Sequence, residues 1–469
     1  MKNLPGFPDE NVFPYDTATA NAVMAQFPDS MNLWHQMARD YANGVTPTTD
    51  SRDRYLPGTA RFDSIRDYYT SRKFTEGGTM FFDKSKLWHL QGEYKFKPSF
   101  MDIVVGGNVR VYLPNSQGTI FSDTGSVKLM NKEAGMYVGL EKKFISDRLK
   151  LNATCRLDKN QNFNFLVSPA LSAVYQLHAD HVVRMALNSA IRNPTLQDQF
   201  LYYNVGRAIL LGNLHGYDSL LTLESMADFF EKPVADTLQF FNLDPIRPEK
   251  VKTIEVGYRG TFANHLYVDA SYYYSMYRDF IGYQIAADAD YIDSLNGQYV
   301  NALQVNRFYR IATNSNSIVT TQGFSIGLNW YFKKYYMVNG NYSWNVLNKM
   351  EQDDPIIPAF NTPQHKFNVG FGGRNIPITL GEKTIRDLGF NFNFKWVQGF
   401  QFEGSPQFTG FVPTYWLLDG QVNKKVEKIH TTFKLGASNI LNRQVIQVFG
   451  GPYVGRMAFF SVLVELDKL

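Results

Sequence analysis

The sequence predicts an all-β fold, namely a transmembrane antiparallel β-barrel with about fifteen visible strands. Three observations lead to this prediction. Apolar and polar residues alternate with period two in one segment after another, the gaps between segments are alternately short and long, and no run of about 18 apolar residues is present that could form a membrane-spanning helix. Side chains at alternate positions of a strand point to opposite faces, so each segment has one apolar and one polar face.

Two segments on either side of the tight turn Lys333-Lys334-Tyr335 show the alternation most clearly. Their apolar positions are Phe324, Ile326, Leu328, Trp330 and Phe332, followed by Tyr336, Val338, Gly340, Tyr342 and Trp344. The segment 388–398 repeats the pattern with Phe390, Phe392, Phe394 and Trp396. A soluble sandwich would bury these side chains beneath a second sheet, whereas a membrane barrel exposes them to lipid and keeps its polar face around a wet lumen.

The composition excludes several classes of function. The net charge is +4, from 47 basic and 43 acidic residues, so a nucleic-acid partner is not expected. The mean hydropathy of -0.28 is ordinary, because barrel strands carry their apolar residues in alternation. The single cysteine, Cys155, lies on the apolar side of its segment, and alone it can form neither an intrachain disulfide nor a cysteine metal cluster.

Residues 1–86 do not alternate, and we expect them to form an extracellular loop region with short helices. Asp29 is placed to cap one helix that ends before Gly44, and Asp63 to cap a second that carries Tyr68 and Tyr69. The first residues have neither a hydrophobic core nor a small-residue cleavage site, so no signal peptide is visible there.

From Leu87 onward the chain reads as strands of an outer-membrane barrel that extends to residue 469. The expected strands in the first half are 88–96, 103–111, 136–140, 149–157, 165–176 and 181–191. Those in the second half are 251–262, 266–286, 303–332, 336–346, 365–373, 388–398, 415–426, 429–438 and 456–466, with one turn passing through Pro377. Since about 9–11 residues cross a bilayer, 266–286 and 303–332 are expected to project well beyond it.

The alternation of short turns and long loops predicts the direction of each strand. Short turns of such barrels face the periplasm, so the last strand runs inward and, counting back, the first of the fifteen also runs inward. Bacterial barrels have an even strand number, so the first part of the barrel is expected to lie upstream, and the chain to be the C-terminal part of a longer protein. Open sheet edges cannot be satisfied by lipid, so we do not expect this piece to be stable alone in a bilayer.

Three stretches carry a resemblance to a known family. Ala190-Ile-Arg-Asn-Pro-Thr-Leu196 resembles a strand end of TonB-dependent outer-membrane receptors, and Ile246-Arg-Pro-Glu-Lys-Val251 resembles their entry into the next strand. Gly436-Ala-Ser-Asn-Ile-Leu-Asn442 resembles their penultimate strand, and residues 61–118 resemble members with large extracellular loops. The resemblance implies a 22-stranded barrel with an internal plug and an N-terminal segment that TonB pulls. Neither the plug domain nor that segment is recognisable in this chain.

Two sets of residues are candidates for contact with a solute. Loop aromatics either anchor a ligand or pack on one another; they are Tyr202, Tyr203, Phe229, Phe230, Phe240 and Phe241. Charged residues between the apolar positions line the lumen, where they either hold a plug or form a solute track; they are Arg110, Glu141, Lys143, Lys150, Arg156, Glu255, Arg259 and Asp269.

Catalysis and metal binding find little support in the sequence. No nucleophile elbow, phosphate loop or pair of catalytic carboxylates is recognisable, so we expect no enzymatic activity and no cofactor. His178 and His181 fall at a tight turn and are expected to be solvated rather than to bind a metal. Asp288, Asp290 and Asp293 have the oxygen ligands that calcium prefers, but they lack the glycine and the terminal Glu of an EF-hand.

We therefore expect an outer-membrane TonB-dependent receptor fragment of a Gram-negative cell that takes up a large, scarce solute. A siderophore, cobalamin, a glycan and a peptide all remain open. The expected partners are outer-membrane lipid, the upstream strands and plug, and the TonB complex, and the presence of a surface lipoprotein is left open. Two alternatives are a passive porin or structural outer-membrane barrel, which would have no plug, and a soluble all-β glycan-binding protein or glycan hydrolase, which would not need detergent.

Overall fold

The computed structural model describes residues 33, 36, 37, 39, 40, 56–206, 208–295, 298–349, 360–404 and 409–465. The chain forms two compact units, Met1–Phe81 and Phe82–Leu469. In the first unit, helix α3 spans Ala60–Thr70 and a 3-10 turn, η1, spans Phe74–Glu76. The expected helix near 29–44 lies for the most part outside the described residues.

The expected cap of the second helix is wrong. Thr59, not Asp63, is the N-cap of α3, because its side chain accepts a hydrogen bond from the backbone N–H of Phe62. Asp63 lies in the first turn, where its carboxylate is 2.9 Å from Arg66 and interacts favourably with the helix dipole.

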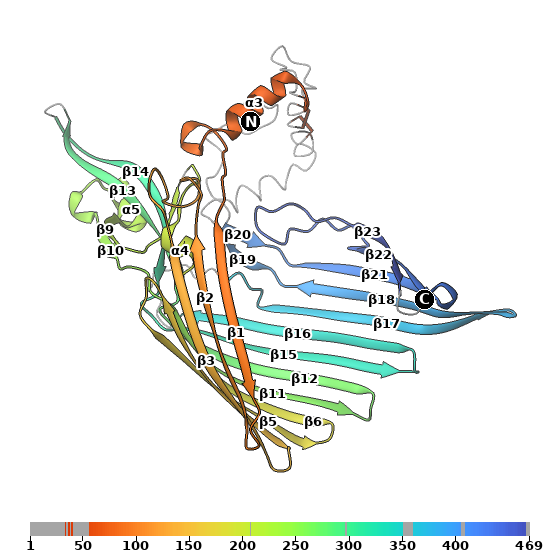
Figure 1. Ribbon diagram of the computed structural model, residues 1–469. Coiled ribbons are helices and arrows are strands. Elements are labelled where there is room, and N and C mark those ends of the chain that lie inside the picture. Colours follow the sequence, from red (N-terminus) through yellow and green to blue (C-terminus); the bar gives the residue numbers. More distant parts are fainter. Residues whose placement is uncertain are drawn as a thin grey trace. The chain divides into compact units, whose positions relative to one another are not determined.

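The second unit is built on a 15-stranded antiparallel sheet, as predicted (Figure 1). Each strand pairs with the next along the sheet, and β1 and β23 are its two edges in the described part of the chain. Figure 1 shows the sheet curved into an open trough. In order, its strands are β1 (Lys86–Phe96), β2 (Asp102–Leu113), β3 (Asn131–Phe144), β4 (Leu149–Asn160), β5 (Leu166–His178), β6 (His181–Arg192), β11 (Glu249–Phe262), β12 (Leu266–Arg278), β15 (Val319–Phe332), β16 (Tyr336–Lys349), β17 (His365–Leu380), β18 (Lys383–Val397), β21 (Tyr415–Val426), β22 (Thr431–Ser438) and β23 (Met457–Val464).

Short turns join the strands at one end of the sheet. Lys333 and Lys334 both have positive φ, as do Ala263 and Asn264, and such turns match the twist of paired strands. The expected turn through Pro377 is wrong. The β17–β18 hairpin continues past Pro377 with two irregularities in register and closes at Gly381, whose φ is +60°.

The two expected long strands, 266–286 and 303–332, are each broken in the structure. Asp279 has a φ of 53°, which ends β12 and starts β13 (Ile281–Leu295) in a new direction. The chain then runs back toward the large sheet in β14 (Gln298–Asn314). This strand ends at Asn314, whose side-chain amide donates to the carbonyls of Arg247 and Asp279. Strands β13 and β14 therefore pair with each other outside the large sheet. The alternation of apolar and polar residues does not show where the chain leaves that sheet.

At the long-loop end of the sheet, β13 and β14 form a second sheet with the order β10-β9-β13-β14-β8-β7. Its core contains Ile209, Leu211, Leu220, Ala286 and Ile311. The remaining elements of this region are α4 (Leu196–Phe200), β7 (Tyr202–Asn204), β8 (Ile209–Leu211), β9 (Tyr217–Leu221), α5 (Leu223–Glu231), η2 (Ala235–Thr237) and β10 (Phe240–Leu243). A separate hairpin pairs β19 (Phe400–Glu403) with β20 (Thr409–Val412), and η4 (Glu427–Ile429) precedes β22.

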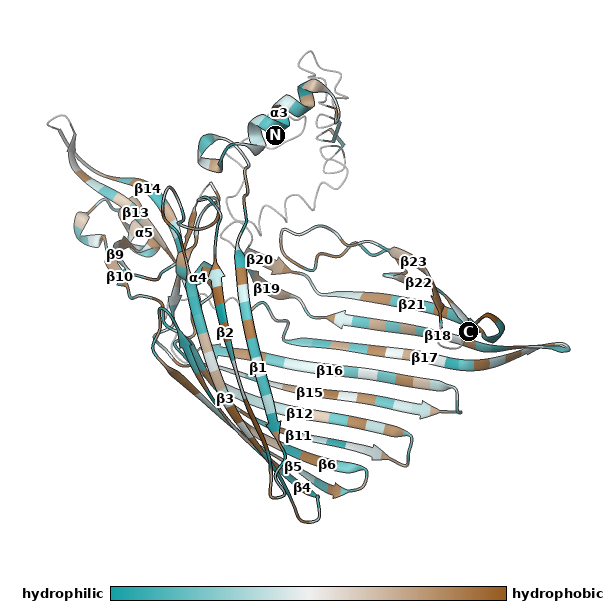
Figure 2. Cartoon of the chain, in the orientation of Figure 1, coloured by the Kyte–Doolittle hydropathy of each residue, from teal (hydrophilic) through white to brown (hydrophobic). Residues whose placement is uncertain are grey.

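The apolar residues form continuous rows across the large sheet. One row crosses β12, β15, β16 and β17 through Tyr272, Phe324, Trp344 and His365. An adjacent row runs through Ala270, Ile326, Tyr342 and Phe367. Figure 2 shows the resulting alternation along each strand. Trp330 is 50% exposed and Phe392 is 42% exposed, and Phe324 and Phe394 are partly exposed, so no second layer covers these four residues within the described chain. No helix in the described residues is long and apolar enough to cross a membrane.

Candidate functional site

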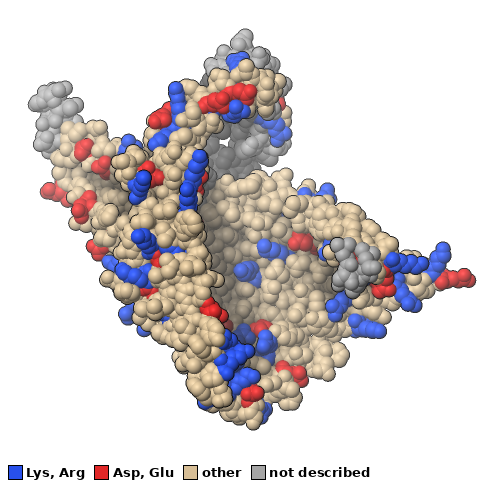
Figure 3. All heavy atoms as spheres, viewed as in Figure 1, with Lys and Arg blue, Asp and Glu red and all other residues tan. Residues whose placement is uncertain are grey.

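The polar face of the large sheet carries most of its acidic residues, and Figure 3 shows charges of both signs in the hollow of the sheet. Seven of the expected lumen residues have a partner there. The ion pairs are Arg110–Glu133 at 3.9 Å, Lys150–Glu141 at 2.8 Å, Lys143–Asp147 at 3.8 Å, Arg156–Asp158 at 2.7 Å, Arg184–Glu255 at 3.9 Å and Arg184–Asp269 at 2.8 Å. Arg259 is exposed and lies opposite Asp269 in the register of β11 and β12.

Glycines allow several polar side chains to reach across an intervening strand. Arg156 on β4 passes over Gly135 on β3 and donates to Asn108 on β2 at 2.8 Å. Arg184 on β6 passes over Gly257 on β11 and donates to Asp269 on β12 at 2.8 Å. A side chain at either glycine would occupy the space of the arginine. The polar face is thus connected across strands as well as along them.

A polar pocket of about 480 Å³ lies on this face, close to the long loops. Strands β2, β3 and β4 provide one wall, and the end of β6 with the start of α4 provides the other. The lining includes Asn108, Arg110, Asn131, Glu133, Arg156, Asp158, Arg192, Asn193 and Thr195. We call this the wall pocket. It brings together two of the expected lumen residues, Arg110 and Arg156, with the motif at 190–196.

The motif forms the second wall for local reasons. Pro194 has no N–H to donate, so strand pairing stops there. Thr195 then caps α4: its hydroxyl accepts from the N–H of Asp198, and the Asp198 carboxylate accepts from the N–H of Thr195. The cap turns the chain across the end of β6 and holds Asn193 over the pocket, where its amide donates to Glu133 at 3.3 Å.

Glu133 is the acceptor at the centre of the wall pocket. Its Oε1 accepts from the amides of Asn160 at 3.0 Å and Asn193 at 3.3 Å, and its Oε2 lies 3.9 Å from Arg110. Within the described residues, the Oδ1 atoms of Asn131 and Asn193 have no hydrogen-bond partner, although Asn131 is only 2% exposed. Buried acceptors of this kind favour a bound group that donates N–H or O–H.

The wall pocket is connected to the second sheet through Glu249. This carboxylate is 7% exposed, accepts from the backbone N–H of Ile281 at 2.9 Å and lies 3.1 Å from Arg192. Ile281 is the first residue of β13, so the pair joins the pocket wall to the hairpin that leaves the large sheet. Phe163, Ile246, Ile281 and Ala312 form an apolar cluster at the same junction.

The loop aromatics fall into two groups. Phe229 is 2% exposed, and Phe241 packs against the core of the second sheet, so both contribute to packing. Tyr202, Phe230 and Phe240 are about half exposed and therefore accessible to a solute, and Tyr203 is partly buried. The structure does not gather the six side chains into one described pocket.

The expected calcium and histidine positions do not form a metal site in the described residues, where no group of three or more His, Cys, Asp and Glu side chains is found. Asp290 accepts from Asn306 at 2.9 Å. Burial raises the pKa of Tyr309, and the neighbouring Asp288 raises it further. The side chain of Asp293 lies outside the described residues. His178 and His181 pair at the β5–β6 turn, and the His181 ring hydrogen-bonds Tyr258.

Sequence reasoning missed Glu133, Asn131, Arg192, Asn193 and Glu249. Glu133 and Asn131 precede the segment that was expected to form β3, which begins five residues earlier than its apolar alternation indicated. Arg192 and Asn193 lie inside the quoted motif but were not identified as lining residues. Their common signal is position: each lies at the long-loop end of a strand, where the polar face meets the loops.

A profile of the β-barrel domain of TonB-dependent receptors matches residues 4–442. The chain belongs to this family. TonB-dependent receptors are transporters that lie in the Gram-negative outer membrane and work with TonB.

Solved structures of this family share the fold. The siderophore receptor PirA from Acinetobacter baumannii is 16% identical, with a TM-score of 0.54 over 82% of this chain and 56% of that chain. The FrpB iron transporter from Neisseria meningitidis (F3-3 variant) is 12% identical, with a TM-score of 0.52 over 81% and 55%. The copper transporter OprC is 13% identical, with a TM-score of 0.54 over 81% and 56%.

These identities are low, so the likeness establishes the fold alone. The chain spans 55–56% of the length of these three solved structures. No curated protein sequence matches it.

Proposed function

We propose that this chain forms the barrel part of a receptor that takes up a large, scarce solute across the outer membrane of a Gram-negative cell. The solute is first held by the loop region around the second sheet and then passes along the polar face. Candidate solutes are a siderophore, cobalamin, a glycan and a peptide. Residues 1–86 lie on the extracellular side, and residues 87–469 supply barrel strands.

The observation that supports this proposal best is the position of the wall pocket. It lies where the long loops meet the polar face, on the path that a captured solute would follow. Its lining offers both arginine donors and carboxylate or amide acceptors, and two of these acceptors have no partner in the described residues. The family match favours a receptor over a passive porin. The uncovered apolar face favours a membrane barrel over a soluble glycan-binding protein.

The proposed partners are those that this function requires. TonB supplies the energy, a plug and further strands complete the barrel, lipid surrounds it, and a surface lipoprotein assists capture. The charges on the polar face would contact either the plug or the passing solute. We propose no cofactor and no catalytic step.

Uptake measurements test the proposal. Cells that carry the receptor at its native length, or lack it, are given labelled ferric siderophores, cobalamin, glycans and peptides. We expect one class to enter only when the receptor and TonB are both present. Uptake that persists without TonB would indicate a passive pore, and the absence of uptake for every class would contradict the proposal.

Variants then test the wall pocket. Glu133→Gln leaves the fold in place but removes the charge that faces Arg110, and we expect the apparent affinity for the solute to fall about tenfold, equivalent to one lost hydrogen bond to a charged group. Glu141→Gln is the matched control, because Glu141 pairs with Lys150 on the same face near the short turns. Equal uptake by the two variants would exclude the wall pocket from the path.

A further inference from the structure

The outward, apolar face of the large sheet carries charges of only one sign. Following the register from strand to strand, its charged residues are Lys86, Lys132, Lys142, Lys159, Lys250, Lys252, Arg278, Lys383 and Lys424. In these described strands no Asp or Glu occupies an outward position. Of the nine residues, Lys142, Lys383 and Lys424 lie near the short turns. The other six are at the long-loop end.

A long side chain explains part of this pattern. A lysine near the end of a strand can extend its amine past the edge of the apolar zone, which a shorter carboxylate cannot do. That account applies equally to both ends of the sheet. The concentration at the long-loop end therefore points to negative charge in the surroundings of that end. Asp279, in the turn after β12, neutralises part of the positive charge at this end, because its carboxylate lies 3.6 Å from the amine of Lys250.

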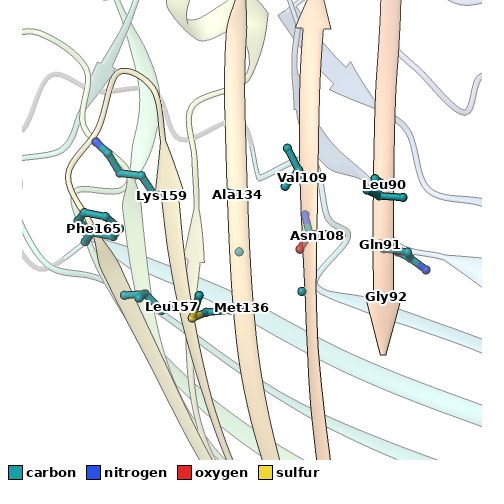
Figure 4. Close-up of a pocket in the computed structure, with 12 residues that line it drawn as sticks. Leu90, Gln91, Gly92, Asn108, Val109, Ala134, Met136, Leu157, Lys159 and Phe165 are labelled. Carbon is teal, nitrogen blue, oxygen red and sulfur yellow. The ribbon is translucent and has the colours of Figure 1, made fainter. Parts of the chain in front are cut away.

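An apolar groove of about 360 Å³ opens on the outward face, and one of these lysines, Lys159, lines it (Figure 4). Its floor is formed where Gly92 on β1 pairs with Gly107 on β2, because neither residue has a side chain. Leu90, Val109, Met136, Leu157 and Phe165 surround the floor. A Cβ at Gly92 would meet nothing within 4 Å, so this part of the groove is open space.

Lys159 lies at the end of the groove nearest the long loops. It lines the groove, its amine donates to the carbonyl of Phe163, and it lies 5.6 Å from the centre of the Phe165 ring. An ammonium group has three donors, so two remain for a ligand. Lys132 is its diagonal neighbour on the same face, since Ala134 pairs with Lys159, and such neighbours are about 7–8 Å apart.

We propose that this groove binds one membrane lipid, with an acyl chain over Gly92 and Gly107 and a phosphate headgroup at Lys159 and Lys132. The apolar lining fits a hydrocarbon chain, and the absence of outward carboxylates removes the charge that would repel a phosphate. The lipid belongs to the leaflet at the long-loop end. The groove opens on the face opposite the wall pocket, and Ala134 and Lys159 belong to the lining of both.

Photolabelling tests the proposal on the receptor extracted at its native length in mild detergent. The probe is phosphatidic acid with a diazirine on one acyl chain, and labelled peptides are identified by mass spectrometry. We expect label in residues 86–113 and 131–165. Phosphatidylcholine with the same chains should label these peptides much less, and inorganic phosphate should not compete.

Two variants separate the headgroup from the chain. Lys132→Gln with Lys159→Gln should lower labelling of these peptides about twenty-five-fold, at about fivefold per lysine. Gly92→Leu should lower it by filling the groove while both lysines remain. The matched controls are Lys424→Gln, an outward lysine that also donates to a backbone carbonyl, and Gly327→Leu on the polar face, where a Cβ meets only one atom, 3.9 Å away.

Several results would overturn the proposal. One is equal labelling by the phosphate and choline lipids, and another is competition by inorganic phosphate. Labelling that is unchanged in the double-lysine variant would remove the headgroup site. A stable dimer whose groove cannot be labelled would assign this face to a second copy of the chain. Heat-dependent gel migration establishes that each variant is folded before it is labelled.

Discussion

A single carboxylate organises the loop between β2 and β3. Asp123 is 7% exposed and accepts from the hydroxyl of Ser116 at 2.5 Å and from the backbone N–H groups of Ser116, Gln117 and Gly118 at 2.5, 3.1 and 2.8 Å. Burial raises the pKa of this carboxyl, but the four donors outweigh burial and hold the pKa below its ordinary value. The loop then contacts the segment after α4, because Ser122 donates to Phe200 and Tyr202 donates to Ile120.

Replacing this carboxylate should loosen the loop in a pH-dependent way. Because the pKa of Asp123 is lower in the folded protein, its stabilisation is complete above the unfolded pKa of about 3.9 and is lost as the pH falls through the folded value. We expect Asp123→Asn to cost about 1–3 kcal/mol of local stability at pH 7 and almost nothing at the lowest pH. Hydrogen exchange of residues 116–123, corrected for intrinsic rates, measures this difference.

The matched control is Asp147→Asn. Asp147 lies in an exposed turn with a single long contact to Lys143, at 3.8 Å. Its replacement should change the protection of its own turn by less than about 0.5 kcal/mol at any pH. If Asp123→Asn left the exchange of residues 116–118 unchanged at pH 7, the carboxylate would not be the organising group of this loop.

At the scale of elements, glycine positions determine which strands of the polar face can be joined by a side-chain hydrogen bond that passes over an intervening strand. Tyr137 on β3 lies over Gly106 on β2, and its hydroxyl donates to Glu93 on β1. Tyr273 on β12 similarly passes over Gly323 on β15 and reaches Asn345 on β16 at 3.0 Å. In each case the middle strand has no side chain at the point of crossing, because a Cβ would lie about 2.4–2.5 Å from the tyrosine ring.

Adding one methyl group should therefore break such a crossing. In Gly106→Ala the new Cβ would lie 2.5 Å from Cζ of Tyr137, so the ring must move away from Glu93. We expect a loss of about 1–3 kcal/mol, measured as a shift of the thermal unfolding midpoint in detergent. Gly92→Ala on the neighbouring strand is the control and should be neutral or slightly stabilising.

A double-variant cycle identifies the cause. In a Tyr137→Ala background, the cost of Gly106→Ala should vanish, because nothing remains above the glycine. A cost of the same size in both backgrounds would locate the effect in the backbone of β2 instead.

The elements also show how far the sequence alone could predict this molecule. Alternation predicted all fifteen strands of the large sheet, because one face of each strand is predominantly apolar. It could not separate β13 and β14 from β12 and β15, since the break depends on the backbone of Asp279 and on hydrogen bonds from Asn314. The parallel pairing of β8 with β14 and the convergence on Glu133 join residues far apart in sequence, and no local pattern encodes them.

At the scale of the whole molecule, the large sheet separates two environments. Its polar face contains paired acids and bases, and its outward face contains apolar rows with a few lysines and arginines near the strand ends. Both sets come from the same strands, one residue apart, so a shift of one residue in register would exchange them. This arrangement suits a sheet with lipid on one side and water on the other, as the family of the chain requires.

A matched pair of lysine substitutions tests this separation directly. Phe392 lies in the middle of β18 on the outward face, between Phe371 and Gly420, and Asn393 is the next residue on the polar face. We expect Phe392→Lys to destabilise the receptor by about 2–4 kcal/mol in vesicles, because the charge is placed near the midplane of the bilayer. Asn393→Lys should cost less than about 1 kcal/mol, because its amine reaches water and Asp419 lies opposite Asn393 in the register. Equilibrium unfolding of the native-length receptor from vesicles measures both values. Equal costs would mean that the two faces share one environment, and the assignment of the outward face to lipid would then be wrong.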